Sequence, residues 1–415
     1  PVRRRLTPQK PVYRFMRGGA LIFPNPVFAG AGATPSTGAY GLLEEFVTDN
    51  PSRTAGTSGE GAAADWIENK LKEFGYTDDD ISRQTFSIEN YLSGVSGSGL
   101  TTTSENISLS VPSAVSNGKV VIGAHYDNAS SLYSGYSATG GQGVSDNGGG
   151  VAVLLELARK FKDVSLDFDL EIVFFGAEEL GLGGSRHYVS GLTQSMKDDI
   201  MLMINIDVVV NGDYLYVWGK DGYTPQAAYF AEVSGGSARV LPANKRAVYG
   251  MSVTGSRPYY TVAHAADSMS FLDAGIPVAF FFSGNLSSGS FGYVENDGMN
   301  GVMHTENDTL EYISERYRDK MISNTDAVVN TIYNGVTADG FVAAVENARD
   351  YITGGFWLSG VYAMAITLVI MAGLGVWAYF YYGKLKKRAI LGTADVRGER
   401  VFTRPDDDDI FTFRS

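Results

Sequence analysis

The sequence predicts an α/β fold in which helices flank a mixed, mostly parallel central sheet. Three apolar runs carry this prediction, because a strand buried on both faces of a parallel sheet reads as a nearly continuous apolar segment. The runs begin at Lys119, Leu170 and Ile200, and each one ends abruptly at polar residues. Apolar residues at helical spacing over 151–158 favour a helix between the first two strands.

The remaining elements follow in chain order. A helical pattern over Gly59 to Phe74 stops at Gly75, and glycine is the usual residue just past a helix end. The Ser-, Gly- and Thr-rich stretch from Ser87 to Asn117 shows no clear period, so it is expected to hold strands and an irregular loop. Two further strands are expected at Asp213 to Gly219 and at Ile276 to Ser283.

Residues 220–263, between these two strands, are expected to contain a helix and an aromatic loop of the kind that shapes a specificity pocket. Tyr133 and Tyr136, in a flexible Gly-rich segment, are candidates for the rim of the same pocket. A helical pattern then runs from Thr309 to about Tyr333, and a shorter one passes through Val345 to Ile352.

Two adjacent carboxylates, Glu178 and Glu179, follow the second apolar run. They would repel each other unless a positive charge lies close by or one of them holds a proton. A metal ion meets this requirement, and open α/β sheets place their sites at the carboxyl ends of strands. The sequence therefore predicts further metal ligands at the neighbouring strand ends.

Histidine and carboxylate side chains occur at these points. His125 and Asp127 follow the first strand, two residues apart and so on the same side of an extended chain. One can bind a metal while the other supports it from behind, although the spacing leaves open whether Asp127 contacts His125 directly. The other candidates are Asp146 at a helix start, Asp207 after the third strand and His304 in a loop before a helix.

The candidate ligands are therefore His125, Asp146, Glu179, Asp207 and His304. Imidazole and carboxylate ligands suit zinc, with manganese or cobalt as alternatives in the same geometry. Two terminal ligands for each of two ions, with one bridging carboxylate, would make a two-metal site beside which a spare glutamate acts as general base. Singly, each residue has a plainer interpretation as a helix cap, a structural histidine or a solvated loop. Their combination in this order makes those interpretations improbable.

The order of these motifs resembles the M28 family of zinc aminopeptidases. The motifs are H-Y-D at 125–127, S-D-N-G-G-G-V-A at 145–152, G-A-E-E-L-G at 176–181, N-I-D at 205–207 and H-T-E-N-D-T at 304–309. The resemblance extends to Asn50 to Tyr76 and Asp267 to Gly284, and it covers roughly residues 48–331.

This resemblance implies two zinc ions and a role for each motif residue. It implies that His125 and Asp207 bind one zinc, that Glu179 and His304 bind the other, and that Asp146 bridges the two ions. It also implies that Glu178 is the general base and that Asp127 supports a ligand without binding the metal. No expected ligand is missing, whereas scaffolding relatives of this fold have lost ligands. His187 and His264 match no ligand position and are expected to be structural. Asp267 is followed by Ser-Met where the family often has a histidine, so at most it supports a ligand from behind.

Composition limits the classes of partner. The chain of 415 residues has a formal net charge of −13, a pI near 4.8 and no cysteine. An acidic surface disfavours binding to nucleic acid, so none is expected as a partner. An acidic site attracts the ammonium group of a peptide N-terminus. Disulfides are excluded.

Four parts of the chain are expected. Residues 1–37 form a basic and apolar arm, 38–352 the peptidase-like domain, 353–383 a transmembrane helix and 384–415 a cytoplasmic tail. Phe356 to Tyr382 contains no charge over 27 residues, about 40 Å as a helix and enough to cross a bilayer core of roughly 30 Å. Basic residues over 384–388 follow at once, which predicts a cytoplasmic C-terminus and a catalytic domain outside the cytoplasm.

The sequence thus favours a membrane-anchored di-zinc metallo-aminopeptidase that acts on peptides with a free N-terminus. One alternative is a structural or accessory subunit of a membrane complex, with a protein partner bound through the membrane helix, the N-terminal arm or the acidic tail. Another is an enzyme like glutaminyl cyclase, which resembles this family but binds one zinc. A carboxypeptidase also stays open, since the sequence does not exclude a carboxylate clamp, although none is identifiable in it.

Overall fold

A computed structural model describes residues 38–90, 92, 100–130, 141–210, 212–220, 224–240, 266–284, 302–346, 348 and 378–383. The strands are β1 (Ile81–Ser87), β2 (Thr103–Val111), β3 (Lys119–His125), β4 (Asp169–Phe175), β5 (Ile200–Ile206), β6 (Tyr214–Trp218), β7 (Ala238–Val240) and β8 (Val278–Gly284). The helices are α1 (Ala39–Asp49), α2 (Ser58–Glu73), α3 (Gly149–Phe161), α4 (Gly183–Gly191), α5 (Gln194–Asp199), α6 (Pro225–Val233), α7 (Ser268–Asp273) and α8 (Leu310–Thr337), and a short turn, η1 (Val144–Gly148), precedes α3.

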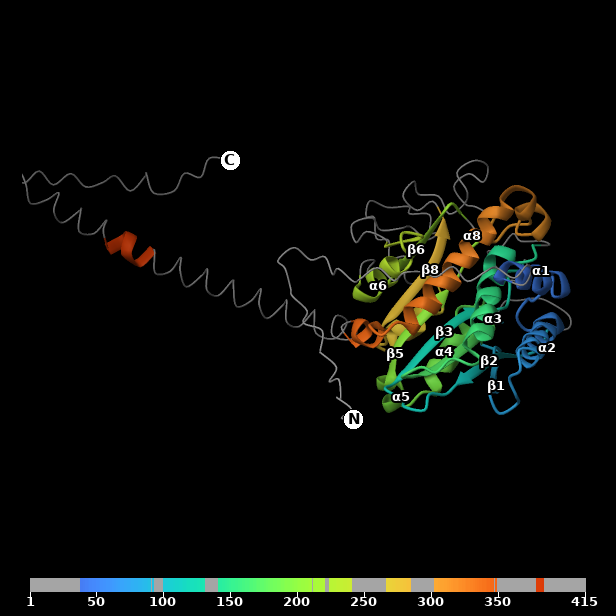
Figure 1. Cartoon of the computed structure of the whole chain (residues 1–415), viewed down its shortest axis with the longest axis horizontal. Coiled ribbons are helices and arrows are strands. Elements are labelled where there is room, and N and C mark those ends of the chain that lie inside the picture. Colours follow the sequence, from blue (N-terminus) through green and yellow to red (C-terminus); the bar gives the residue numbers. More distant parts are fainter. Residues whose placement is uncertain are drawn as a thin grey trace, which may run out of the picture. The chain divides into compact units, whose positions relative to one another are not determined.

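The strands form one mixed sheet in the order β1-β2-β4-β3-β5-β8-β6-β7 (Figure 1). Its centre is parallel, since β3 pairs in parallel with both β4 and β5, and β5 pairs in parallel with β8. On either side of this centre the neighbouring strands β2 and β6 are antiparallel. The predicted fold class, a mixed and mostly parallel sheet flanked by helices, is therefore confirmed.

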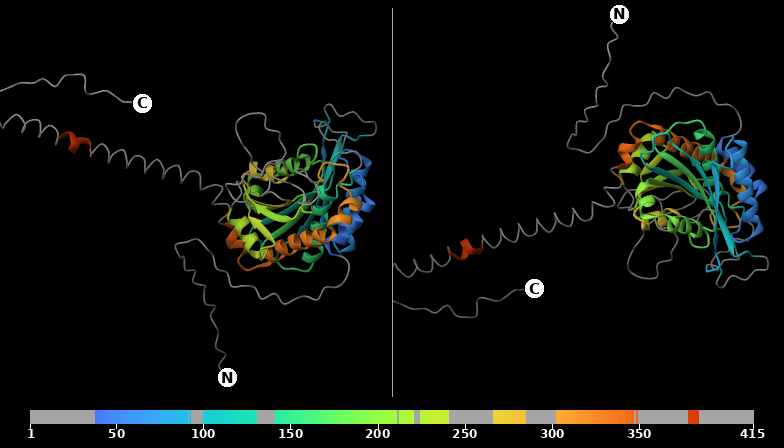
Figure 2. Two further views of the ribbon diagram at one scale, coloured as in Figure 1. Left: turned by 90° about the horizontal axis from the view of Figure 1, so that it is seen from above. Right: turned by 90° about the horizontal axis from the view of Figure 1, so that it is seen from below.

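Both faces of the central strands are covered, which explains why their sequences are mostly apolar, with Glu171 of β4 and Asn205 of β5 among the exceptions. Ile122 of β3 belongs to the core shared with α1, α3 and α8, whereas its neighbour Val121 belongs to the core shared with α4 and α7. Figure 2 shows the long helix α8, in orange, on one side of the sheet and the green helix α4 on the other. Successive residues of a strand point to opposite faces, so each core takes alternate residues.

The crossovers reverse direction at β3. The chain leaves β3 for α3 on one face of the sheet and leaves β4 for α4 on the other. Such a reversal opens a crevice at the carboxyl ends of the strands. The polar residues that follow β3, β4 and β5 therefore lie at this crevice.

Most predicted elements are confirmed to within a few residues. The end of α2 at Gly75 is confirmed, because Gly75 has a left-handed φ of +92° and the next amide, of Tyr76, donates to the Leu71 carbonyl at 3.2 Å. The short helix expected through residue 352 begins earlier than predicted, since residues 341–346 are already helical, and 349–352 lie outside the described residues.

The predicted arm (1–37), tail (384–415) and most of the predicted membrane segment lie outside the described residues. Of the segment Phe356 to Tyr382, only 378–382 are described, and they are helical. No helix within the described ranges combines the length and apolar character that crossing a membrane requires. The membrane segment stays a prediction.

Candidate metal centre

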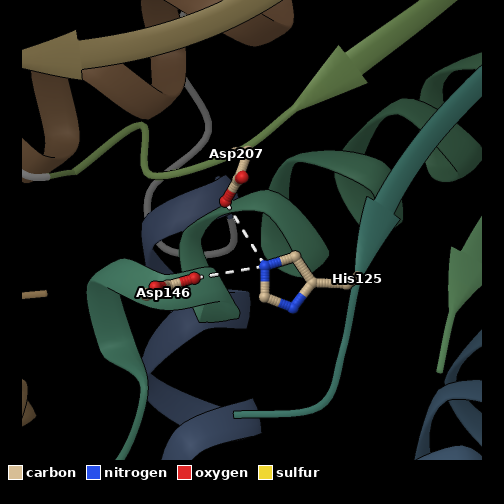
Figure 3. Close-up of side chains that lie close together, drawn as sticks. All are labelled: His125, Asp146 and Asp207. Atoms are coloured by element: carbon tan, nitrogen blue, oxygen red, sulfur yellow. Dashed lines mark ion pairs between the residues drawn. The ribbon is translucent and has the colours of Figure 1, made fainter. Parts of the chain in front are cut away.

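His125 and Asp207 lie side by side because two neighbouring parallel strands end at the same edge of the sheet. Gly123 of β3 pairs with Asn205 of β5, and His125 and Asp207 come two residues further along. His125 Nε2 lies 3.4 Å from Asp207 Oδ1 and 3.1 Å from Asp146 Oδ1 (Figure 3). All three side chains are buried. The strand register therefore brings His125 and Asp207 together, and the η1 turn adds Asp146 to the group.

Asp146 lies between the two histidines. It belongs to η1, the turn before α3, and its peptide bond to Asn147 is cis. Its Oδ1 atom faces His125 Nε2 at 3.1 Å, and its Oδ2 atom faces His304 Nε2 at 2.9 Å. A carboxylate with one oxygen directed at each of two imidazoles has the arrangement expected of a bridging metal ligand.

Glu178 and Glu179 lie in the loop between β4 and α4. Glu179 Oε1 lies 3.3 Å from His304 Nε2, so Asp146, Glu179 and His304 form a second convergent group beside His125, Asp146 and Asp207. Within each group the candidate ligand atoms lie within 4.8 Å of one another. Glu178 is buried near both groups and belongs to neither. The structure thus brings together all five predicted ligands and the predicted base.

Asp127 connects His125 to the glutamate pair. His125 Nδ1 lies 3.2 Å from the backbone carbonyl oxygen of Asp127 and 3.5 Å from its Oδ1 atom. The same carboxylate accepts hydrogen bonds from the backbone N–H groups of Glu178 at 3.0 Å and Glu179 at 3.2 Å. Asp127 therefore contacts the imidazole of His125 through its backbone carbonyl and, at the longer distance, through its carboxylate, while that carboxylate also holds the glutamate loop.

The site is strongly acidic, with five buried carboxylates around two imidazoles. Two imidazolium charges could balance only part of this negative charge. Burial raises the pKa of Glu178 well above its ordinary value, and the neighbouring carboxylates raise it further. Burial alone would lower the pKa of His304, but the facing carboxylates of Glu179 and Asp146 raise it to about 11. Glu178 and His304 thus both favour the protonated state, which reduces the net negative charge of the cluster.

Divalent cations would supply the missing positive charge, and the residues fit them. Glu179 Oε1 and Asp207 Oδ1 are buried and make no hydrogen bond among the described residues, although each faces a histidine Nε2 atom at 3.3 and 3.4 Å. Buried carboxylate oxygens without hydrogen bonds are costly unless a cation binds them. Imidazole nitrogen and carboxylate oxygen are ligands that zinc accepts.

The backbone at this edge of the sheet is unusual. Ala177 precedes the glutamate pair with φ +53°, Val208 follows Asp207 with φ +52°, and His304 itself has φ +57°. Left-handed backbone costs a residue with a β-carbon of the order of 1–2 kcal/mol. Such conformations persist where the surrounding structure enforces them, and they concentrate at functional sites. Nothing in the sequence patterns predicted these positions.

The sequence did not identify three buried charged residues that surround the site. Arg53 donates hydrogen bonds to loop carbonyls, and Asp308 accepts them from backbone amides of the Asp146 loop. Glu60 accepts from the Gly56 amide at 2.7 Å, and burial raises the pKa of Glu60 to about 8. All three residues lie in stretches of sequence that resemble the family, so the resemblance could have drawn attention to them. Their contacts could not be predicted from the resemblance.

Other predicted residues have plainer positions. The imidazole of His187, on α4, stacks on the Phe86 ring with centroids 5.0 Å apart, as a structural residue would. Asp267 is buried next to α7, and burial raises its pKa to about 7 while Ser185 lowers it. The charge of Asp267 also contributes to the raised pKa of Glu178. Asp267 therefore lies near the site, in keeping with the expectation that it would at most support a ligand. Tyr133, Tyr136, His264 and the predicted aromatic loop over 241–263 lie outside the described residues.

Comparison with known proteins agrees with this fold and identifies the family. The model of the family described as "Peptidase family M28" matches residues 106–329, more than half of the chain. The chain therefore belongs to peptidase family M28. Aminopeptidase YwaD of Bacillus subtilis is 30% identical over 240 residues, which are 56% of this chain and 45% of that relative.

Solved structures share the fold at lower identity. BSAP, a zinc aminopeptidase from Bacillus subtilis, superposes with a TM-score of 0.53 and 19% identity over 72% of this chain and 94% of that one. A glutaminyl cyclase from an Acidobacteriales bacterium superposes with a TM-score of 0.53 and 18% identity over 74% and 99%. The chain spans about half the length of the curated relatives that it matches.

Proposed function

We propose that the protein is a metallo-aminopeptidase that uses two zinc ions, with manganese or cobalt as alternatives, to remove N-terminal residues from peptides. The observation that carries the proposal is the Asp146 carboxylate, whose two oxygens face His125 and His304. Asp207 completes one ligand group and Glu179 the other. Membership in a peptidase family supports peptide-bond hydrolysis, and a relative named as an aminopeptidase supports action at the N-terminus.

Glu178 is proposed as the general base. When bound, zinc ions polarise the peptide carbonyl and lower the pKa of water. Glu178 takes the proton from the attacking water and gives it to the leaving amine. Its burial among negative charges, which raises its pKa, favours the protonated form that the second transfer needs. Asp127 keeps Glu178 in place by accepting its backbone N–H at 3.0 Å.

A panel of matched peptides tests the reaction class. The full chain, loaded with zinc, is expected to release the first residue from peptides with a free N-terminus and to leave the same peptides intact once they are N-acetylated. The reason is that the acidic site attracts an ammonium group, which acetylation removes. Amidation of the peptide C-terminus should have no effect. Release of C-terminal residues, or equal cleavage of acetylated peptides, would contradict the proposal.

Glutaminyl cyclization is the second candidate, because a cyclase shares the fold over most of the chain. That likeness shows the fold alone, and the presence of both ligand groups favours the two-metal peptidase. A peptide with N-terminal glutamine separates the two reactions by mass. Hydrolysis releases free glutamine, whereas cyclization loses ammonia and leaves the peptide one residue longer than the hydrolysis product.

We also propose that the chain is anchored in a membrane through Phe356 to Tyr382, with its catalytic domain outside the cytoplasm. The uncharged segment and the basic residues over 384–388 support this orientation. The full chain should require detergent for extraction, and deletion of 356–382 should release it. Extraction of the full chain by buffer alone would refute the anchor. A protein partner through this segment or the acidic tail would be seen as a larger species in mild detergent.

A further inference from the structure

Two buried charged side chains hold the loop that carries Asp146, and neither belongs to a ligand group. The loop runs from Gly141 to Asp146. Gly143 has a left-handed φ of +59°, and a β-carbon there would lie 2.6 Å from the Asn128 side chain and 2.9 Å from Arg53. The loop is therefore packed tightly against its surroundings at its midpoint.

Arg53 holds one side of this loop through its carbonyl groups. Its guanidinium, fully buried, donates to the Gln142 oxygen at 2.7 Å and to the Gly143 oxygen at 2.9 Å. Its Nε atom donates to the Tyr126 carbonyl at 2.6 Å. Since Tyr126 lies between His125 and Asp127, Arg53 ties the Asp146 loop to the strand end that carries the first histidine.

Asp308 holds the other side through amide groups. Its Oδ1 atom accepts from the Ser145 N–H at 2.6 Å, and its Oδ2 atom accepts from the Asp146 N–H at 3.1 Å. Its backbone carbonyl accepts from the Gln142 N–H at 2.7 Å. Because both carboxylate oxygens are occupied by amides, Asp308 is directed at the backbone of the loop and is in neither ligand group.

Asp308 also belongs to the same turn as His304. The Asp308 amide donates to the Thr305 carbonyl at 3.2 Å, and the Thr305 amide donates to the Val302 carbonyl at 3.1 Å. The backbone that carries His304 is thus joined to the backbone of Asp146 through one carboxylate. The His304 to Asp146 contact, 2.9 Å between Nε2 and Oδ2, lies directly beside this connection.

We infer that Asp308 is a positioning residue that fixes Asp146 relative to His304 and so sets the affinity for the cation of the second ligand group, Asp146, Glu179 and His304. This inference rests on the proposed two-metal function. The other members of the first group, His125 and Asp207, depend on other contacts. The β3 to β5 register places His125 beside Asp207, and Arg53 keeps the Asp146 loop against Tyr126. Loss of Asp308 should therefore weaken one of the two cations selectively.

The Asp308→Asn variant of the full chain tests this inference. Asparagine keeps the size of the side chain and one acceptor oxygen, but its NH₂ group cannot accept the second amide. Zinc titration against a competing chelator, without any substrate, measures the two affinities. One of the two zinc affinities, that of the second ligand group, is expected to fall about 10- to 100-fold, the range for loss of a group that supports a ligand. The other affinity should stay unchanged.

The matched control is Asp169→Asn. Asp169 also accepts a backbone N–H, that of Ser113 at 2.8 Å, but it lies at the opposite end of β4 from the site. Both zinc affinities should be unchanged in this variant. A second test variant, Gln142→Ala, removes the hydrogen bond at 2.8 Å between the Gln142 side chain and the Leu310 amide. Because Gln142 is only partly buried, this variant should fold, and it should weaken the same zinc to a smaller degree.

The outcomes separate the inference from the function on which it rests. Two zinc ions in the wild type and two unchanged zinc affinities in both test variants would overturn the inference alone. An equal loss of both affinities would also overturn it, since Asp308 would then support the whole site. Wild-type protein that binds a single zinc would overturn the two-metal proposal and this inference together.

Discussion

Replacement of Glu178 by glutamine is expected to lower kcat by about 10²- to 10⁴-fold, the contribution typical of a general acid–base group. Glutamine has the shape of glutamate but cannot take the proton from the attacking water. Zinc content should be unchanged, because Glu178 lies outside both ligand groups. Substrate affinity should also change little, so the loss should appear in kcat and not in KM.

The comparison needs a control carboxylate on β4, the strand that precedes Glu178. Glu171 of β4 pairs with Lys119 at 2.8 Å, in the part of the strand remote from the glutamate pair, so Glu171→Gln should keep full activity. Zinc content and initial rates of the wild type, Glu178→Gln and Glu171→Gln test the assignment of Glu178 as the base. Undiminished turnover of Glu178→Gln would place the base elsewhere, and loss of zinc along with activity would make Glu178 a ligand.

Replacement of Asp146 by alanine is expected to have the second large effect, the loss of both zinc ions. Within the described part of the chain, Asp146 is the one residue shared by the two ligand groups, with one oxygen directed at each histidine. Its removal leaves only His125 and Asp207 in one group and Glu179 and His304 in the other. Activity should fall to background as a consequence.

Thermal unfolding with and without zinc measures this loss independently of activity. A ligand that binds only the folded state stabilises it, by about 2.7 kcal/mol when its concentration is 100 times Kd. Zinc should therefore raise the Tm of the wild type and leave that of Asp146→Ala unchanged. A variant that still binds one zinc with wild-type affinity would show that Asp146 serves one cation only.

The sequence predicted that the candidate ligands converge, because the signal for each of them is local. Each apolar run shows where a parallel strand ends, and parallel strands end at a common edge, so His125, Glu179 and Asp207 were expected close together. The sheet confirms that placement. Asp146 and His304 were found through their motifs, and the structure places them opposite each other at 2.9 Å.

The contacts around the ligands could not be predicted because they join residues far apart in the chain. Asp308 reaches the amides of Ser145 and Asp146 across 163 and 162 positions, and Arg53 reaches Gly143 across 90. Periodic patterns in the sequence do not predict hydrogen bonds between residues so far apart. The left-handed backbone of His304 could not be predicted either, because a positive φ is uncommon for residues other than glycine and no sequence pattern marks it.

The central claim is that five side chains bind two cations at one edge of the sheet. Anomalous X-ray scattering at the zinc edge, from crystals of the zinc-loaded protein, tests it most directly. The account predicts two peaks, one among His125, Asp146 and Asp207 and one among Asp146, Glu179 and His304. A single peak, or peaks away from these side chains, would contradict it.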